Sequence, residues 1–126
     1  MRTSTMPTLQ SGMPNTLAQV KVPYVNYNQS TILYSDDYLF FPAEKEVFGT
    51  RTYSPEAEAN ALTQFAYYKN GGSKIKSLPG STSANNWWLR SVLFNDGARF
   101  CAVWSSGAVD YGQASFSRGA SPCFCV

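Results

Sequence analysis

The chain has no histidine, little charge and no long apolar run, and each absence excludes a class of function. Without an imidazole there is neither a Ser-His-Asp nor a Cys-His catalytic arrangement. Charged residues make up 14% of the chain and the net charge is +2, without the clustered Lys and Arg of a nucleic-acid-binding protein. No apolar run approaches the ~20 residues that a membrane span needs. We therefore expect no nucleic-acid partner and no membrane insertion.

Aromatic residues, by contrast, reach 15% of the 126 residues, so the low charge indicates a rich core and not disorder. A chain of this length supports a single domain. Residues 1–18 are rich in Thr, Ser, Pro and Asn and have no hydrophobic period, which predicts a flexible N-terminal lead-in or linker. The domain itself is then expected to cover residues 19–126.

Two helices are predicted in the middle of the chain. Residues 43–48 form the first, which Gly49 ends as a left-handed cap. Ser54 as N-cap and Pro55 at the first helical position predict the start of the second. Its apolar stripe consists of Ala57, Ala61, Leu62, Phe65 and Tyr68. Strands are expected at residues 19–26, 30–34 and 38–41 before the helices, and at 87–92, 99–104, 108–114 and 122–126 after them. This order indicates an α+β fold with an antiparallel sheet.

The three cysteines give no clear metal or redox site. Cys123 and Cys125 share one face of an expected strand and cannot easily bond to each other. Buried free thiols are the favoured interpretation, and a disulfide from Cys101 to either of the others is the alternative. A zinc site would need a fourth ligand that the chain does not supply. We expect no metal and no cofactor.

The acidic residues do not predict acid–base catalysis either. Glu44 and Glu46, like Glu56 and Glu58, lie two apart on expected helices, so neither pair shares a helix face. With no histidine and no paired carboxylates, we expect that the protein is not an enzyme.

Residues 87–126 carry most of the information. Apolar and small polar residues alternate there, and Lys, Glu and Met are absent. Large side chains fall next to the turns between the expected strands, which is typical of a surface that binds a partner. The predicted contact residues are Leu93, Phe94, Asn95, Arg99, Trp104, Asp110, Tyr111, Ser115 and Phe116. For Phe94 and Phe116, burial in a small sheet is an equally good interpretation.

Five segments in order resemble a known family. They are AEKEVFG (43–49), YYKN (67–70), WWLRS (87–91), FCAV (100–103) and PCFCV (122–126). Residues 30–126 resemble a C-type-lectin-like domain of gut bacteria and their phages, often found at the C-terminus of surface or tail-fibre proteins. This resemblance implies a C-type-lectin-like fold, with two helices packed on a small antiparallel sheet. It also implies a location on a virion tail or a bacterial cell surface.

The C-terminal arrangement also resembles the variable proteins of diversity-generating retroelements. In that system Asn codons with a fixed last base are rewritten at adenines, which never yields Lys, Glu, Met, Trp or Gln. The missing Lys, Glu and Met fit this pattern, whereas Trp104 and Gln113 cannot arise by it. The sequence departs from the lectin-like family at Ala43, where Ser is frequent, and at Val92, where Pro is frequent. The acidic and Asn motifs of calcium-dependent sugar binding are absent.

The expected function is therefore a non-catalytic ligand- or receptor-binding module, whose partner is a protein or glycan on a host cell. An alternative is an assembly domain whose aromatic loops form a subunit interface, for example in a trimer. A third hypothesis is an enzyme related to the formylglycine-generating oxidases, which would use Cys101 or Cys123.

Overall fold

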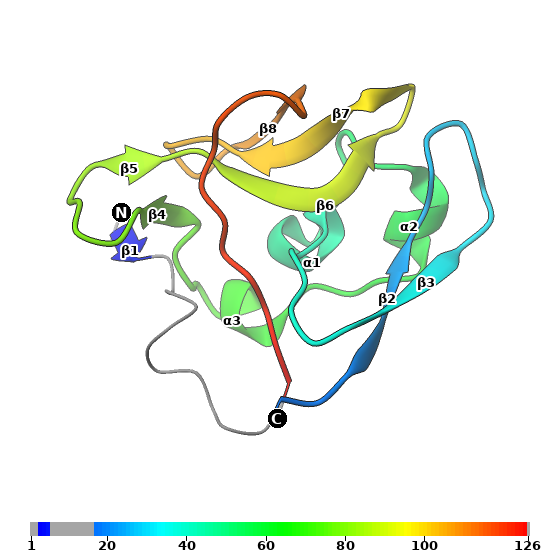
Figure 1. Cartoon of the computed structure of the whole chain (residues 1–126), viewed down its shortest axis with the longest axis horizontal. Coiled ribbons are helices and arrows are strands. Elements are labelled where there is room, and N and C mark those ends of the chain that lie inside the picture. Colours follow the sequence, from blue (N-terminus) through cyan, green and yellow to red (C-terminus); the bar gives the residue numbers. More distant parts are fainter. Residues whose placement is uncertain (1–2, 6–16, 126) are drawn as a thin grey trace.

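The computed structural model describes residues 3–5 and 17–125, and it consists of three small sheets and three short helices (Figure 1). The first sheet has the order β1-β4-β5, with bounds Thr3–Thr5, Ile75–Ser77 and Ala84–Asn85. The second is the hairpin of β2 (Val20–Tyr24) and β3 (Leu33–Asp37). The third has the order β6-β7-β8, with bounds Trp87–Leu93, Asp96–Val103 and Val109–Gln113. The helices are α1 (Glu44–Phe48), α2 (Glu56–Asn60) and α3 (Ala66–Lys69).

The predicted fold class is wrong, because the chain does not pack two helices on one sheet. Its strands are mainly antiparallel, with one parallel pair between β1 and β4, and its helices are only five, five and four residues long. The molecule is rich in sheet, and short helices fill the space beneath β6–β7–β8 and beside it (Figure 1).

The predicted second helix is split because tertiary hydrogen bonds replace its middle turn. The Phe65 N–H donates to the Glu46 carbonyl at 2.8 Å, and the Gln64 side chain donates to the Val47 carbonyl at 3.0 Å. These bonds satisfy carbonyls at the end of α1, which a helix end otherwise leaves without partners. The start is also shifted: Pro55 is the N-cap, and the Ser54 hydroxyl bonds to Glu44 instead of capping the helix.

The core lies between α1, α3 and the inner face of the β6–β7–β8 sheet. Strand β6 alternates between buried and half-buried positions, which is the period of a strand with one face in the core. The buried cluster consists of Val47, Tyr68, Trp87, Leu89, Cys101 and Val103. Trp87 is 0% exposed, and its indole N–H donates to the Lys74 carbonyl at 3.0 Å. A buried Trp whose polar atom is satisfied fixes β6 against the rest of the chain.

The C-terminal segment joins distant parts of the fold, but it does not form the predicted strand at residues 122–126. Isolated bridges pair Gly119 with Trp87, Cys123 with Phe40 and Cys125 with Ala18. The segment (red in Figure 1) thus runs from the edge of β6 to the start of β2. Of the predicted lead-in, Thr3–Thr5 forms β1 alongside β4, and residues 1–2 and 6–16 lie outside the described residues. No helix within the described ranges has the length and apolar character to cross a membrane.

Candidate functional site

A buried carboxylate holds the loop that precedes α2. Glu44 is 0% exposed, and its side chain accepts the backbone N–H groups of Thr52 (2.8 Å), Tyr53 (2.9 Å) and Ser54 (3.1 Å). The Ser54 hydroxyl donates to the same carboxylate at 2.7 Å. A carboxylate that accepts several backbone N–H groups is well satisfied in a dry interior. Glu44 therefore fixes residues 52–54 in one conformation.

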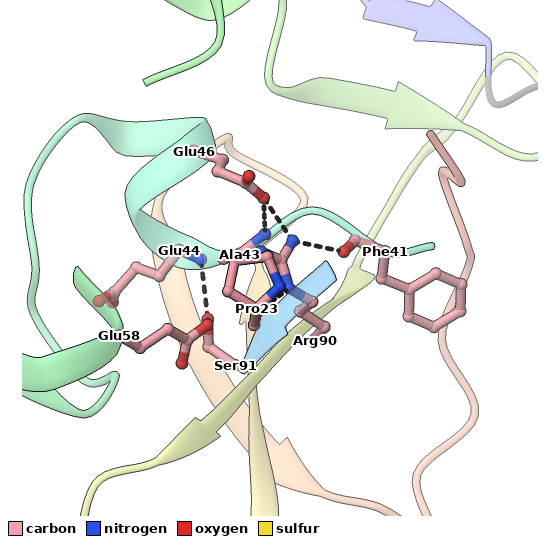
Figure 2. Close-up of polar contacts among 8 residues, drawn as sticks. All are labelled: Pro23, Phe41, Ala43, Glu44, Glu46, Glu58, Arg90 and Ser91. Atoms are coloured by element: carbon pink, nitrogen blue, oxygen red, sulfur yellow. Dashed lines mark hydrogen bonds and ion pairs between the residues drawn. The ribbon is translucent and has the colours of Figure 1, made fainter. Parts of the chain in front are cut away.

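A second buried acid, Glu46, forms an ion pair with Arg90 of β6 (Figure 2). Its Oε1 also accepts the Ala43 N–H at 2.9 Å, at the start of α1. Arg90 donates in addition to the carbonyls of Pro23 and Phe41, each at 3.0 Å. This guanidinium therefore links β6 to β2, to the segment before α1 and to α1 itself. The Arg90 side chain is 11% exposed and its charge is compensated by Glu46, whereas its Nη2 has no hydrogen-bond partner among the described residues.

Ser91 connects the third buried acid, Glu58 of α2, to this network (Figure 2). Its hydroxyl accepts the Glu44 N–H at 3.0 Å and donates to Glu58 Oε1 at 2.8 Å. Burial raises the pKa of Glu58 to about 7, against a smaller opposing effect of the Ser91 hydrogen bond. The spacing of the acids along each helix did not predict this cluster. Glu44 and Glu46 come from α1 and Glu58 comes from α2, so the cluster is a tertiary contact between helices. All three carboxylates are buried. Those of Glu44 and Glu46 make the hydrogen bonds and the ion pair that hold the neighbouring segments in place.

Four of the predicted contact residues gather at one end of the β6–β7–β8 sheet. We call this the turn surface and define it as Arg51, Tyr53, Phe94, Asn95, Arg99 and Tyr111. Its first part is centred on Phe94, at the β6–β7 turn, whose ring is 43% exposed. The Arg51 guanidinium lies 5.7 Å from the centre of this ring, and the Phe94 N–H donates to the Tyr53 carbonyl at 2.9 Å.

The second part of the turn surface is centred on Tyr111 of β8, which is 37% exposed. Tyr53 meets it edge-on with ring centres 4.9 Å apart, and the Arg99 guanidinium lies 6.0 Å from its ring centre. Arg99 also forms an ion pair with Asp96 at 3.5 Å. Tyr53 connects the two parts of the turn surface. Its N–H donates to the Glu44 carboxylate, its carbonyl accepts the Phe94 N–H, and its ring contacts the ring of Tyr111. These contacts of Tyr53 hold Phe94 and Tyr111 in place relative to the buried Glu44.

The remaining predicted residues lie elsewhere. Asp110 forms an ion pair with Arg118 at 3.1 Å, and that guanidinium stacks 4.8 Å from the Trp88 ring centre and 5.8 Å from that of Phe116. Ser115 is exposed beside Phe116, which is 50% exposed. Trp104, at the β7–β8 turn, is exposed and makes no ring contact with the other predicted residues that the structure describes.

Leu93 requires a correction. It was expected among the contact residues, yet it is only 6% exposed. As the last residue of β6, it continues the inward-facing set that begins with Trp87 and Leu89. Its side chain belongs to the core and is not available to a partner.

A cleft of about 930 Å³ lies between the β2–β3 hairpin and the outer face of β6–β7. Its walls include Tyr24, Tyr27, Phe40, Phe41, Arg90, Val92 and Phe100, and its rim includes Asn26, Asn28, Gln29 and Thr31. None of the predicted contact residues lines it. Part of it could have been found from the alternation in β6, because Arg90 and Val92 occupy the positions that face away from the core. The other wall of the cleft comes from the β2–β3 hairpin, which is distant in sequence, so no local pattern predicted that the two would meet.

Comparison with protein families gives one match, which covers residues 3–126 and carries the description "domain of unknown function (DUF6273)". The chain belongs to the DUF6273 family. No curated protein and no solved structure matches the chain. The family description names no activity, so the function of this DUF6273 chain has to be inferred from its own residues.

Two of the three thiols of this DUF6273 chain, those of Cys101 and Cys123, are wholly or partly shielded from solvent. Cys101, Cys123 and Cys125 are all free. Burial raises the pKa of Cys101 far above its ordinary value and that of Cys123 to about 11, so both are protonated thiols near neutral pH. A protonated thiol is a poor nucleophile and a poor metal ligand. Within the described ranges, no group of His, Cys, Asp and Glu is placed to hold a metal ion.

Proposed function

We propose that this DUF6273 domain is a non-catalytic recognition module, and that its partner binds on the turn surface. The observation that carries this proposal is the fixed pair of exposed rings, Phe94 and Tyr111, on a frame that buried Glu44 holds in place. Single exposed apolar residues are normal on a protein surface, whereas a group of neighbouring exposed rings marks a recognition site.

The composition of the turn surface suits recognition. Aromatic and Arg side chains contribute most of the binding energy at protein interfaces, and Asn adds hydrogen bonds. The guanidinium groups of Arg51 and Arg99 already lie over the rings of Phe94 and Tyr111. Because these side chains are ordered before binding, they lose less conformational entropy when a partner arrives. The surface is therefore prepared to bind without rearrangement.

Two features support a non-catalytic role. The acids that come together, Glu44, Glu46 and Glu58, are buried and hold loops and strands. The raised pKa values of Cys101 and Cys123 keep both thiols protonated, which weighs against an oxidase that uses them.

The partner that we propose is a protein or glycan on a host cell, met by a domain carried on a virion tail or bacterial surface. The resemblance of five sequence segments to surface and tail-fibre domains supports this setting. In the alternative, the same rings bury themselves against a second copy of the chain, as an assembly domain would require.

The test measures binding of the fluorescently labelled domain to a panel of bacterial cells by flow cytometry. We expect that the double variant Phe94→Ser, Tyr111→Ser binds about tenfold or more weakly than the wild type, as expected when hot-spot rings are lost. The matched control is Tyr34→Ser, Tyr38→Ser, which removes two exposed rings from another part of the surface.

An equal loss in both double variants would contradict the proposal, because it would show that the turn surface has no special role. Sedimentation velocity on the wild type distinguishes a recognition module from an assembly domain. A monomer agrees with recognition, whereas a stable oligomer that the Phe94→Ser, Tyr111→Ser variant dissociates would identify an assembly domain.

A further inference from the structure

We propose that the cleft between the β2–β3 hairpin and the outer face of β6–β7 binds a short, neutral carbohydrate. The cleft shares no lining residue with the turn surface, so this second site does not depend on the proposed function. Its volume of about 930 Å³ is at the upper end of the ~300–1,000 Å³ typical of small-molecule sites. That size suits a few sugar rings.

Aromatic rings form the walls of the cleft. Tyr24, Phe40, Phe41 and Phe100 are half-buried there, and Tyr27 is 46% exposed at the mouth. The face of a sugar ring carries C–H groups that pack on an aromatic face, because the face of an aromatic ring is negative and C–H hydrogens are weakly positive. A wall of several rings thus offers a platform for more than one sugar unit.

Amides and hydroxyls surround the aromatic walls. Asn26, Asn28 and Gln29 are exposed at the rim, and no side-chain hydrogen bond engages their amides among the residues that the structure describes. A side-chain amide both donates and accepts hydrogen bonds, as a sugar hydroxyl does. The backbone of this rim is already ordered: the Gln29 N–H donates to the Asn26 carbonyl at 3.2 Å, and the Asn28 N–H donates to the Phe94 carbonyl at 3.3 Å.

The charge of the cleft argues for a neutral ligand. Among its described lining residues, Asp37 and Arg90 carry charge. The positive charge of Arg90 is paired with buried Glu46, and its Nη2, which has no hydrogen-bond partner among the described residues, is closed to solvent, so Arg90 is not presented to a phosphate or a carboxylate. Asp37 accepts a hydrogen bond from the Ser35 hydroxyl at 2.5 Å and adds an acceptor for sugar hydroxyls. An anionic ligand would meet this carboxylate without a free cation to balance it.

Tyr27 is placed by a close approach to the sheet. A Cβ atom at Gly97 would lie 2.4 Å from the Tyr27 ring, so only a glycine lets the ring rest on β7. Gly97 and Tyr27 both line the cleft. The mouth of the cleft is therefore shaped by a contact between the β2–β3 connection and β7, and Gly97→Ala should displace the Tyr27 ring.

The experiment probes the full chain with a microarray of neutral and acidic oligosaccharides, and the strongest neutral hit is then titrated by calorimetry. We expect binding of at least one neutral oligosaccharide. The variant Asn26→Ala, Gln29→Ala should weaken it about tenfold, because two ligand hydrogen bonds are lost. Both side chains are exposed and make no internal hydrogen bond within the described part of the chain, so the variant should fold normally.

The matched control is Asn60→Ala, Gln113→Ala, which removes two exposed amides outside both the cleft and the turn surface. Unchanged affinity in this control and weaker binding in Gly97→Ala would place the sugar in the cleft. The proposal is overturned if no neutral oligosaccharide binds, if binding is confined to acidic glycans, or if the control weakens binding as much as the rim variant. Loss of cell binding by the Phe94→Ser, Tyr111→Ser variant has no bearing on these outcomes, so the two proposals fail separately.

Discussion

The two faces of the β6–β7 strand pair differ in what they do. The inner face carries Trp87, Leu89, Cys101 and Val103, all almost completely buried against α1. The outer face carries Arg90, Val92 and Phe100, which are half-buried and line the cleft. The side-chain alternation of a strand allows this division, because each face can be changed without moving the other. The inner face accounts for stability, and we assign binding to the outer face and to the turn surface at its end.

The largest effect should come from the inner face. Trp87→Ala removes the largest fully buried side chain and should lower the free energy of unfolding by about 3–5 kcal/mol, because it leaves a cavity and an unpaired Lys74 carbonyl. Chemical denaturation measures this loss. Phe100→Ala on the outer face should cost clearly less, and a similar loss for both variants would contradict the division between the faces.

The ion pair beneath the sheet should come next. Glu46→Ala leaves Arg90 as a buried charge without its partner and should cost about 3 kcal/mol or more. The control is Asp36→Ala, which breaks the exposed pair with Lys21 and should change stability by less than ~1 kcal/mol. Urea unfolding of both variants gives the comparison, and an equal effect would mean that burial does not distinguish the two pairs.

Adjacent residues at the β6–β7 turn provide a sharper test. Leu93 is buried and Phe94 is exposed, so Leu93→Ala should cost about 2–4 kcal/mol and Phe94→Ala about 1 kcal/mol or less. Thermal unfolding followed by circular dichroism resolves the difference. The reverse order would show that the turn is oriented differently and that Phe94, not Leu93, belongs to the core.

The last effect concerns pH and not the loss of a side chain. The pKa of Glu58 is raised from 4.5 to about 7, so the folded state binds the proton more tightly than the unfolded state. Stability should therefore fall as the pH rises from about 4.5 to 7, by up to ~3 kcal/mol, and the full contribution is present below this range. Glu58→Gln should remove this part of the pH dependence. If the variant and the wild type show the same slope in urea unfolding across this range, Glu58 does not titrate as described.

Local patterns in the sequence predict the β6–β7–β8 sheet and α1, but not the second predicted helix. Strict alternation placed the three strands of the β6–β7–β8 sheet within a few residues, and Gly49 ends α1 with a positive φ of 74°, as its position predicted. The second helix was predicted too long, because the bond from Phe65 to Glu46 is a tertiary contact that no local window contains. The predicted N-cap at Ser54 is wrong for the same reason, because the Ser54 hydroxyl donates to buried Glu44 and does not cap the helix.

The site was predicted only in part, for a related reason. Phe94, Asn95, Arg99 and Tyr111 come together because they lie at one end of neighbouring strands, which the sequence order makes plausible. The other half of the turn surface, Arg51 and Tyr53, comes from a loop whose position depends on Glu44. The cleft depends on contacts between residues about 70 positions apart, such as Tyr27 with Gly97 and Pro23 with Arg90. Periodicity contains no information on such pairs.

Hydroxyl-radical footprinting of the domain, free and mixed with cells that are found to bind it, tests the central claim most directly. Oxidation rates of aromatic side chains report their exposure one residue at a time. We predict that binding lowers the oxidation of Phe94 and Tyr111, whereas Tyr34 and Tyr38, which are exposed elsewhere, keep their rates. Unchanged oxidation of Phe94 and Tyr111 in the bound state would contradict the assignment of recognition to the turn surface.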